Sequence, residues 1–284
     1  MARSEFNYKA PFKVTEEMKE SFDEKGYVLI RGLLEKDELQ KIQSVFEDNE
    51  EIKRNSFVTD DNEGRKSRVT IWSQPGNDVT GMLSRSQRVA GTCAELLGGE
   101  VYHYHSKLMM KEARTGGRFV WHQDYGYWYK NGILFPDMMS VFVAIDKCEK
   151  ANGCLQILEG SHKCGRIEHG MVGGQTGADV DRVEQLKSRL PLKYVELNAG
   201  DAIFFHCNVL HTSNANLSDN RRWVFIACYN KASNDPVVEH HFPRYNKLDI
   251  VSDTAIRECT NFTNMDGKAF MNPADNKTIK ASRG

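Results

Sequence analysis

The pattern of apolar residues changes near residue 100, and this change limits the possible folds more than any other feature. Before that point, polar segments carry apolar residues at the spacing of amphipathic helices, and a short apolar run between two of them indicates a strand. Two glycines follow the last of these segments, as is common at the end of a helix. The predicted helices cover residues 14–25, 35–52 and 89–97, and the predicted strand covers 27–30.

From residue 100 onward, short segments rich in Val, Ile, Phe and Tyr alternate with turn-forming residues. This alternation is typical of antiparallel β-structure, and strands at this spacing indicate a sandwich or barrel. A polar, glycine-containing stretch over 165–190 is expected to form a lid-like insertion, partly helical over 178–189. The predicted strands cover residues 101–111, 119–122, 140–145, 155–158, 194–197, 202–206 and 222–229.

No internal repeat, low-complexity tract or linker rich in Pro, Gly and Ser divides the 284 residues. A chain of this length forms one large domain or two small ones, and the lack of a linker favours one. We therefore expect a single domain over residues 1–284. Its parts are a mainly helical region at 1–99, a β core at 100–230 and a C-terminal extension at 231–284.

Composition and charge exclude several classes of protein. The 38 Lys and Arg residues nearly balance the 39 Asp and Glu residues, whereas nucleic-acid binding usually requires a strongly basic face. The longest apolar runs are far shorter than the ~20 residues of a membrane span, and the first residues lack the apolar segment of a secretory signal. Seven cysteines without a C-x-x-C pair fit reduced thiols. We expect a cytoplasmic protein that acts on a small molecule, without nucleic-acid or membrane partners.

Two groups of histidines indicate where the chemistry takes place. The first is the W-H-Q-D motif at 121–124, where residues two apart on a strand project to the same face, so His122 and Asp124 can bind one ion. The second group, His206 and His211, lies near the end of a late predicted strand. One histidine, one carboxylate and a distant second histidine form the facial triad of non-haem Fe(II) oxygenases. Both histidines of the second group are candidates for the distant ligand.

Arg222 adds a possible anchor for a cosubstrate. It follows His211 by eleven residues, at the start of a predicted strand. A buried guanidinium offers a fork of donors that suits a carboxylate. A cosubstrate that chelates iron at one end and meets Arg222 with a carboxylate at the other end would fit this arrangement.

Several further segments accompany these residues along nearly the whole chain. They are G-Y-V-L-I-R-G-L-L (26–34), W-H-Q-D (121–124), N-G-C-L-Q-I-L-E-G-S-H (152–162), G-D-A-I-F-F-H (200–206), H-T-S (211–213) and R-R-W (221–223). Together they resemble the phytanoyl-CoA dioxygenase family of Fe(II)- and 2-oxoglutarate-dependent oxygenases.

The resemblance implies a mainly β fold, a double-stranded β-helix (jelly roll) with N-terminal and peripheral helices. It also implies that His122, Asp124 and His211 hold Fe(II), because the distal ligand of the family is the later histidine of the pair. Arg222 then binds the C5 carboxylate of 2-oxoglutarate, and O2 is the oxidant. The residues expected to assist in binding 2-oxoglutarate are Ser213, Ser140 and Lys107.

A narrower resemblance is to the ectoine hydroxylases of the same family. The stretch 104–124 and the Y-G-Y-W segment at 125–128 are similar to their sequence before and after the H-x-D motif, and Lys107 stands where those enzymes carry a basic residue. Met109 takes the place of a polar Asn in those enzymes. This difference argues against ectoine itself as the substrate.

The residues that follow the metal motif are expected to line the substrate site. The segment 125–128 after the motif contains three aromatic residues. An aromatic face binds a cation or an amine with about 0.5–2 kcal/mol, so these residues favour a small polar substrate that is cationic or zwitterionic. The alternative is that the same residues pack in the core. The expected substrate-lining residues are Trp128, Tyr127, Tyr125 and His206.

The intact Asp124 favours hydroxylation with release of succinate and CO2, because halogenating members of the family carry Gly or Ala at this position. An acyl-CoA hydroxylase is the alternative within the family, although no basic cluster flanks the motifs to bind the phosphates of CoA. Two further alternatives are a jelly-roll protein that binds metal or ligand without turnover, and a zinc hydrolase with the same triad. Arg222 would have no role in the hydrolase.

Overall fold

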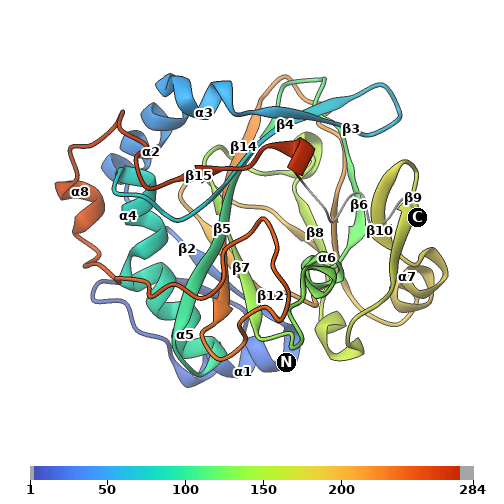
Figure 1. Cartoon of the computed structure of the whole chain (residues 1–284). Coiled ribbons are helices and arrows are strands. Elements are labelled where there is room, and N and C mark those ends of the chain that lie inside the picture. Colours follow the sequence, from blue (N-terminus) through green and yellow to red (C-terminus); the bar gives the residue numbers. More distant parts are fainter. Residues whose placement is uncertain (1–2, 276–284) are drawn as a thin grey trace.

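Residues 3–275 are described by a computed structural model, in which a large and a small β-sheet pack against each other (Figure 1). The large sheet has nine strands, in the order β1 (Glu5–Asn7), β2 (Tyr27–Arg31), β12 (Ala202–His206), β7 (Met138–Ala144), β14 (Arg222–Lys231), β5 (Val101–Lys111), β4 (Lys66–Ser73) and β15 (Ala269–Phe270), with β3 (Phe57–Asp60) also paired to β4. The small sheet has four strands, in the order β11 (Leu192–Val195), β8 (Leu155–Leu158), β13 (His211–Ser213) and β6 (Phe119–His122). A separate hairpin joins β9 (His169–Val172) to β10 (Gln175–Ala178).

The alternation of side chains along the central strands divides the core into two layers. In β12, Phe204 faces the helices while Ile203 and Phe205 face the small sheet. Leu155 and Ile157 of β8 meet that second face. Each central strand is therefore apolar on both sides, because both of its faces are covered.

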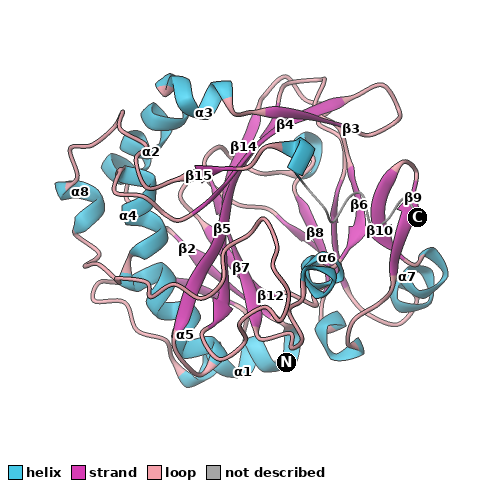
Figure 2. Ribbon diagram, viewed as in Figure 1, coloured by secondary structure: helices cyan, strands magenta, loops and turns pink. Residues whose placement is uncertain are grey.

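Helices cover the outer face of the large sheet, on the left in Figure 2. Local signals fix their ends: Thr15 caps α1 by accepting a hydrogen bond from the Met18 amide, and Gly26 ends it in the left-handed conformation, with φ of 84°. The helices of this layer are α1 (Glu16–Lys25), α2 (Lys36–Asp48), α3 (Glu50–Arg54), α4 (Val79–Arg85), α5 (Thr92–Leu97) and α8 (Ala255–Glu258). Two further helices, α6 (Asp124–Trp128) and α7 (Val180–Lys187), lie on the side of the small sheet (Figure 2).

Most of the predicted strands are present, four of them with the expected bounds: β5, β6, β8 and β12. The strand expected at 140–145 begins two residues earlier as β7, and the one expected at 194–197 is shifted to β11. The helix expected at 89–97 is divided into a π-helical turn (Gln87–Gly91) and α5. The strands that the sequence analysis missed are β1, β3, β4, β9, β10, β13 and β15.

The insertion at 165–190 consists of the β9–β10 hairpin followed by α7, which confirms the predicted helical part. The hairpin packs beside β6, the strand that ends at His122. The Tyr127 hydroxyl donates a hydrogen bond to the Thr176 carbonyl of β10 at 2.6 Å. The insertion thus borders the segment that carries the W-H-Q-D motif. Within residues 3–275, no helix is long and apolar enough to cross a membrane.

A buried ion pair joins the helical layer to the C-terminal extension. The Arg88 guanidinium donates to Glu38 Oε2 at 2.9 Å, and it also donates to the carbonyls of Leu33 at 2.8 Å and Asp253 at 3.0 Å. The Arg88 and Glu38 side chains are 1% and 2% exposed. Removal of one partner would leave the other charge buried without compensation.

Arg88→Ala is therefore expected to lower the free energy of unfolding by about 3–5 kcal/mol, measured by urea denaturation. The matched control is Arg54→Ala, because the Arg54 side chain is 74% exposed and only meets Glu51 at 3.6 Å. That change is expected to stay within about 0.5 kcal/mol. Equal losses in the two variants would show that the buried pair does not anchor the helices.

Candidate active site

Three potential metal ligands meet where the small sheet borders α6. His122 ends β6, Asp124 begins α6, and His211 begins β13. The two histidines are direct partners in the antiparallel pairing of β6 with β13, and their ring centroids are 4.1 Å apart. One ligand atom from each of the three residues lies within 4.8 Å of the others. The structure thus brings together the predicted triad.

Backbone hydrogen bonds fix the orientation of both imidazoles. His122 Nδ1 lies 2.7 Å from the Val120 carbonyl, and His211 Nδ1 lies 2.9 Å from the Val209 carbonyl. A carbonyl can only accept, so each Nδ1 carries the proton and each Nε2 is left with a lone pair for a metal. This arrangement is typical of histidines that bind metals, where the second nitrogen donates to a fixed acceptor.

The electrostatic environment also suits a divalent cation. Burial lowers the pKa of both His122 and His211, which favours the neutral imidazole that coordinates metals. Burial alone would raise the pKa of Asp124, but the Lys107 ammonium and the hydrogen bond from Ser140 help to hold it below its usual value. The site therefore offers two neutral imidazoles and one carboxylate, with further positions open for other ligands.

Asp124 is held by a serine from the large sheet. Ser140 Oγ donates to Asp124 Oδ2 at 2.6 Å, while Lys107 Nζ lies 3.9 Å from Asp124 Oδ1. Ser140 was expected to assist in binding 2-oxoglutarate, but its side chain is buried against Asp124 and Cys228 and does not line the cavity. In this structure the Ser140 hydroxyl is engaged with the carboxylate of the triad.

The cavity beside the triad has a volume of about 280 Å³. Most of its surface is apolar, and the charged side chains among its described lining residues are Asp124, Lys107 and Arg222. The other lining residues used below are His105, Met109, Tyr127, Trp128, Ser213, Phe242 and Met271.

Arg222 lines this cavity with two unpaired donors on its guanidinium. The side chain begins β14, is 1% exposed, and has no hydrogen-bond partner at Nε or Nη2. Burial lowers its pKa, although an arginine remains charged in proteins. An uncompensated buried cation is unfavourable, so these donors call for an anion such as a carboxylate.

Lys111 lies behind this end of the cavity and was not identified from the sequence. It is fully buried, and its Nζ donates to Ser213 Oγ at 2.8 Å. Burial and the neighbouring Arg222 guanidinium lower the pKa of Lys111. Ser213, expected to assist the cosubstrate, lines the cavity next to Arg222 with its hydroxyl already oriented by Lys111.

The aromatic segment after Asp124 forms the short helix α6 and therefore divides between the core and the cavity. Tyr127 and Trp128 line the cavity, as expected. Tyr125 was also expected to contact substrate, but it is 3% exposed, its hydroxyl donates to the Ile133 carbonyl at 3.2 Å, and it is not among the residues that line the cavity.

His206, expected at the substrate site, is likewise not among the residues that line the cavity. Its ring lies 5.5 Å from that of His162 and 5.9 Å from that of Phe22, beneath α1. Burial, followed by the neighbouring His162, lowers its pKa to about 4. His206 is a packed histidine at the end of β12, and His211 occupies the distal position of the triad.

The sequence analysis also missed a buried histidine that supports the W-H-Q-D motif. His169 Nε2 accepts a hydrogen bond from the Gln123 amide at 2.9 Å, and its Nδ1 lies 2.8 Å from the Ile167 carbonyl. The Gln123 side chain donates to the Asn208 carbonyl at 2.8 Å. These bonds link the predicted lid to the residue between the two metal ligands. His169 lies in the polar, glycine-containing stretch 165–190, and nothing in that local sequence indicates a hydrogen bond to Gln123.

Comparison with known proteins gives consistent results. The family Phytanoyl-CoA dioxygenase (PhyH) matches residues 22–224. An L-proline trans-4-hydroxylase from Streptomyces griseoviridis is 30% identical over 176 residues, which are 56% of this chain and 66% of that enzyme. An ectoine dioxygenase from Stutzerimonas stutzeri (strain A1501) is 25% identical over 236 residues, 78% of each protein.

Solved structures agree in fold. EctD from S. alaskensis in its apoform has a TM-score of 0.71 and 21% identity, over 88% of this chain and 91% of that one. The epimerase SnoN, solved with Fe3+, α-ketoglutarate and nogalamycin RO, has a TM-score of 0.63 and 18% identity, over 81% and 97% of the chains. The predicted jelly-roll class with peripheral helices is confirmed. The chain belongs to the phytanoyl-CoA dioxygenase family of Fe(II)- and 2-oxoglutarate-dependent oxygenases.

Proposed function

We propose that this oxygenase hydroxylates a small metabolite of the amino-acid class, one that carries a carboxylate and an amine. His122, Asp124 and His211 would hold Fe(II), and Arg222 would hold the C5 carboxylate of 2-oxoglutarate. The observation that carries the proposal is the cavity itself: it is small, and it contains one lysine besides the arginine that the cosubstrate needs.

When bound, Fe(II) and 2-oxoglutarate activate O2 and supply the oxidising power for hydroxylation, with release of succinate and CO2. The chain supplies placement and electrostatics. The backbone carbonyls behind His122 and His211 fix both rings, and Ser140 fixes the carboxylate of Asp124. Arg222 and the hydroxyl of Ser213 orient the cosubstrate by charge-assisted and neutral hydrogen bonds. The apolar walls exclude water from the reacting centre.

The sequence suggested that Lys107 assists 2-oxoglutarate, but its place in the cavity makes it, in this proposal, the partner of a carboxylate on the substrate. Its side chain is 21% exposed, lines the cavity and lies 3.9 Å from Asp124 Oδ1. An ammonium at this distance from the triad can bind a substrate carboxylate while the substrate extends toward the metal. Tyr127 and Trp128 offer aromatic faces on which an amine binds with about 0.5–2 kcal/mol.

Two of the relatives are named for small metabolites of similar type, L-proline and ectoine. Met109, which replaces Asn in the ectoine hydroxylases, lines the cavity with its thioether. We therefore expect a cyclic or branched amino acid in preference to ectoine. An acyl-CoA substrate is disfavoured, because no cluster of Lys and Arg lines the described cavity to bind phosphates.

The decisive test of the cofactor pair is an anaerobic titration of the apoprotein with Fe(II) and then with 2-oxoglutarate. A weak visible charge-transfer band is expected when the cosubstrate chelates the metal. Folded protein that binds metal without developing this band would contradict the proposal and favour a zinc hydrolase or a binding protein.

His211→Ala is expected to abolish stoichiometric Fe(II) binding, because it removes one of three ligand atoms that lie within 4.8 Å of one another. His206→Ala is the matched control and should retain binding, since His206 packs near Phe22 and His162 away from the cavity. Metal content after dialysis measures both. The reverse pattern would overturn the ligand assignment.

Arg222→Ala is expected to raise the dissociation constant of 2-oxoglutarate about ten- to a hundredfold, since a charge-assisted bond contributes about 1.5–3 kcal/mol. Fe(II) binding should persist. The control is Arg221→Ala, whose guanidinium is 33% exposed and pairs with Asp146 and Glu47. The anaerobic band titration measures all three proteins. Unchanged affinity in Arg222→Ala would remove this residue from the site.

The substrate class is tested with a panel of free L-amino acids, cyclic imino acids, ectoine and short-chain acyl-CoAs, with succinate formation as the readout. Stimulation by an amino or imino acid is expected. Lys107→Met should raise the KM of that substrate about tenfold, because a charge-assisted contact to its carboxylate is lost. Stimulation by acyl-CoA alone would contradict the proposed class.

A further inference from the structure

The C-terminal extension contributes two side chains to the cavity. Phe242 comes from the loop after β14, and Met271 directly follows β15. Both lie beyond residue 224, where the match to the family ends. This part of the wall is therefore not accounted for by membership of the family, and it can distinguish the substrate of this chain from those of its relatives.

Phe242 closes the end of the cavity next to His105. Its ring stacks on the His105 imidazole with centroids 4.5 Å apart and planes inclined by 20°, and it lies 5.0 Å from the Tyr104 ring. His105 and Tyr104 are 2% and 0% exposed, so both belong to the rigid interior. The Phe242 ring thus packs against two buried side chains, which fix its position at this end of the cavity.

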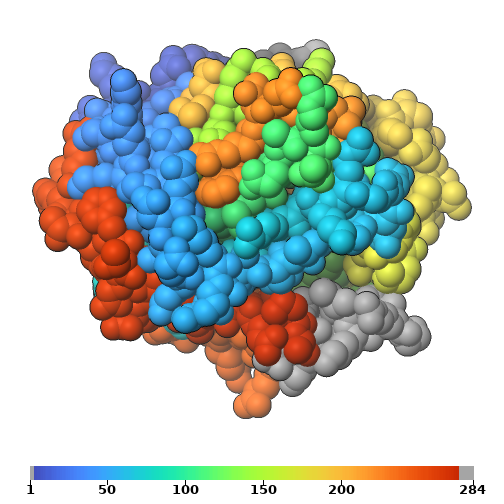
Figure 3. Space-filling model, turned by 90° about the horizontal axis from the view of Figure 1, so that it is seen from above, coloured from blue at the N-terminus to red at the C-terminus, as the bar shows by residue number. Residues whose placement is uncertain are grey.

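Met271 forms a boundary beside β4. Its backbone amide donates to the Ile71 carbonyl at 2.9 Å, directly after β15 pairs with β4. Phe270 packs on Trp72 in the core, with ring centroids 6.0 Å apart, so the next residue projects to the other face, where Val69 and Ile71 also line the cavity. In Figure 3, the red C-terminal segment lies against the light-blue segment of β3 and β4.

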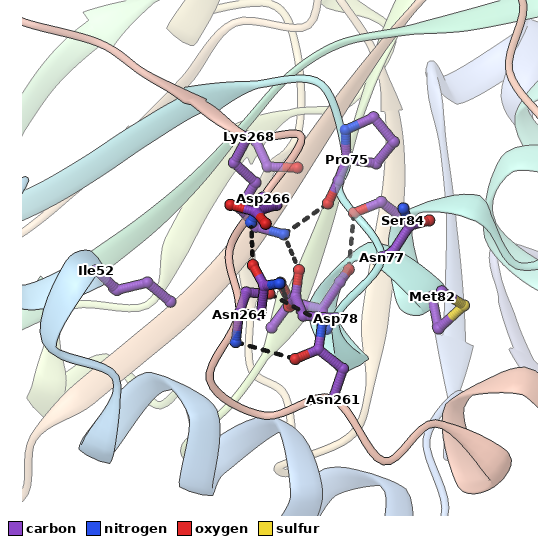
Figure 4. Close-up of polar contacts among 12 residues, drawn as sticks. Ile52, Pro75, Asn77, Asp78, Met82, Ser84, Asn261, Asn264, Asp266 and Lys268 are labelled. Carbon is purple, nitrogen blue, oxygen red and sulfur yellow. Dashed lines mark hydrogen bonds and ion pairs between the residues drawn. The ribbon is translucent and has the colours of Figure 1, made fainter.

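A buried ion pair holds this segment in place, three residues before Met271. The side chains of Lys268 and Asp78 are both 0% exposed. Figure 4 shows the Lys268 ammonium between the Asp78 carboxylate and the Pro75 carbonyl, which it meets at 2.6 Å. The same carboxylate caps α4 by accepting a hydrogen bond from the Thr80 amide at 2.9 Å. The extension is thereby tied to the start of α4.

The turn that precedes Lys268 is fixed to the same helix. The Val79 amide donates to the Asn261 carbonyl at 3.1 Å. Asn261 Nδ2 donates to the Asn264 carbonyl at 2.9 Å, and Asn264 Oδ1 accepts from the Asp266 amide at 2.7 Å (Figure 4). Residues 261–268 are therefore fixed against the start of α4 before the chain continues into β15 and reaches the cavity at Met271.

We propose that the C-terminal extension is a specificity-determining wall of the active site. Phe242 and Met271 set the size of the substrate that fits, and Lys268, paired with Asp78, is a positioning residue that holds Met271 at the cavity. The inference rests on the proposed function in one respect, namely that the cavity receives a small amino acid.

The wall is tested with Phe242→Ala and Met271→Ala against a panel of L-amino and imino acids of graded size. Each variant is expected to shift the ratio of kcat/KM for larger over smaller substrates by about tenfold or more, the usual effect of space for one or two methylene groups. The affinity for 2-oxoglutarate in the anaerobic titration should stay within twofold. Met171→Ala, a methionine that is 52% exposed outside the cavity, is the control.

The inference requires that both variants shift the ratio of kcat/KM toward larger substrates. If either variant binds 2-oxoglutarate normally and leaves this ratio unchanged, the inference is overturned. If the wild-type protein turns over no member of the panel, the proposed substrate class fails and the wall is judged by consumption of 2-oxoglutarate without substrate. Opening the wall admits water, so Met271→Ala should raise this consumption at least about twofold and Met171→Ala should not. Equal rates would overturn the wall as well.

Lys268→Met separates positioning from a merely structural role. The expected result is a KM about tenfold higher for the preferred amino acid, with kcat and the affinity for 2-oxoglutarate within twofold of wild type. If this variant fails to fold, Asp78→Asn serves instead, because it removes the negative charge while retaining an oxygen to cap α4. A lower melting temperature with unchanged KM would show that the pair is structural only.

Discussion

The pairing of β13 with β6 is the constraint on which the active site depends. It places His211 directly opposite His122, so the distance between these two candidate metal ligands is set by the spacing of adjacent strands. A slip of one residue would turn the His211 side chain to the other face of the sheet. The third candidate ligand, Asp124, lies two residues after His122, at the first residue of α6. Ser140 of the large sheet donates a hydrogen bond to its carboxylate. Both sheets must therefore be assembled before the triad exists.

The elements that could be predicted from the sequence are those whose side chains face two apolar layers. The strands at 155–158 and 202–206 are nearly continuous apolar runs, and the structure places them in the interior of the two sheets. β3 and β4 escaped prediction because they are rich in polar and charged residues: Arg68 faces solvent while Val69 lines the cavity. β13 is only three residues long, and its pairing with β6 and β8 is a long-range contact that local patterns do not contain.

The sequence pattern indicated His122, Asp124 and two candidate distal histidines, and the resemblance to the family selected His211, which the structure brings beside the other two. The residues that line the cavity were harder to predict from the sequence. The aromatic segment 125–128 lies in the helix α6, which the sequence did not predict, so Tyr125 turns into the core while Tyr127 and Trp128 reach the cavity. His206 lies only five residues before His211, but it ends β12 of the large sheet whereas His211 begins β13 of the small sheet, a difference that local sequence does not show. Lys111 and His169 act through bonds to distant residues, Ser213 and Gln123, that no local pattern reveals.

The empty hydrogen-bonding positions of Arg222 also bear on the stability of the whole chain. Arg222 and Lys111 are two buried cations in neighbouring positions of paired strands, and no acidic side chain is hydrogen-bonded to either of them in the described part of the chain. The folded state bears this electrostatic cost until a carboxylate arrives. A ligand that binds only the folded state adds about 2.7 kcal/mol at a hundredfold excess over its dissociation constant. If 2-oxoglutarate is this ligand, as we propose, its concentration would set the stability of the folded enzyme as well as its rate.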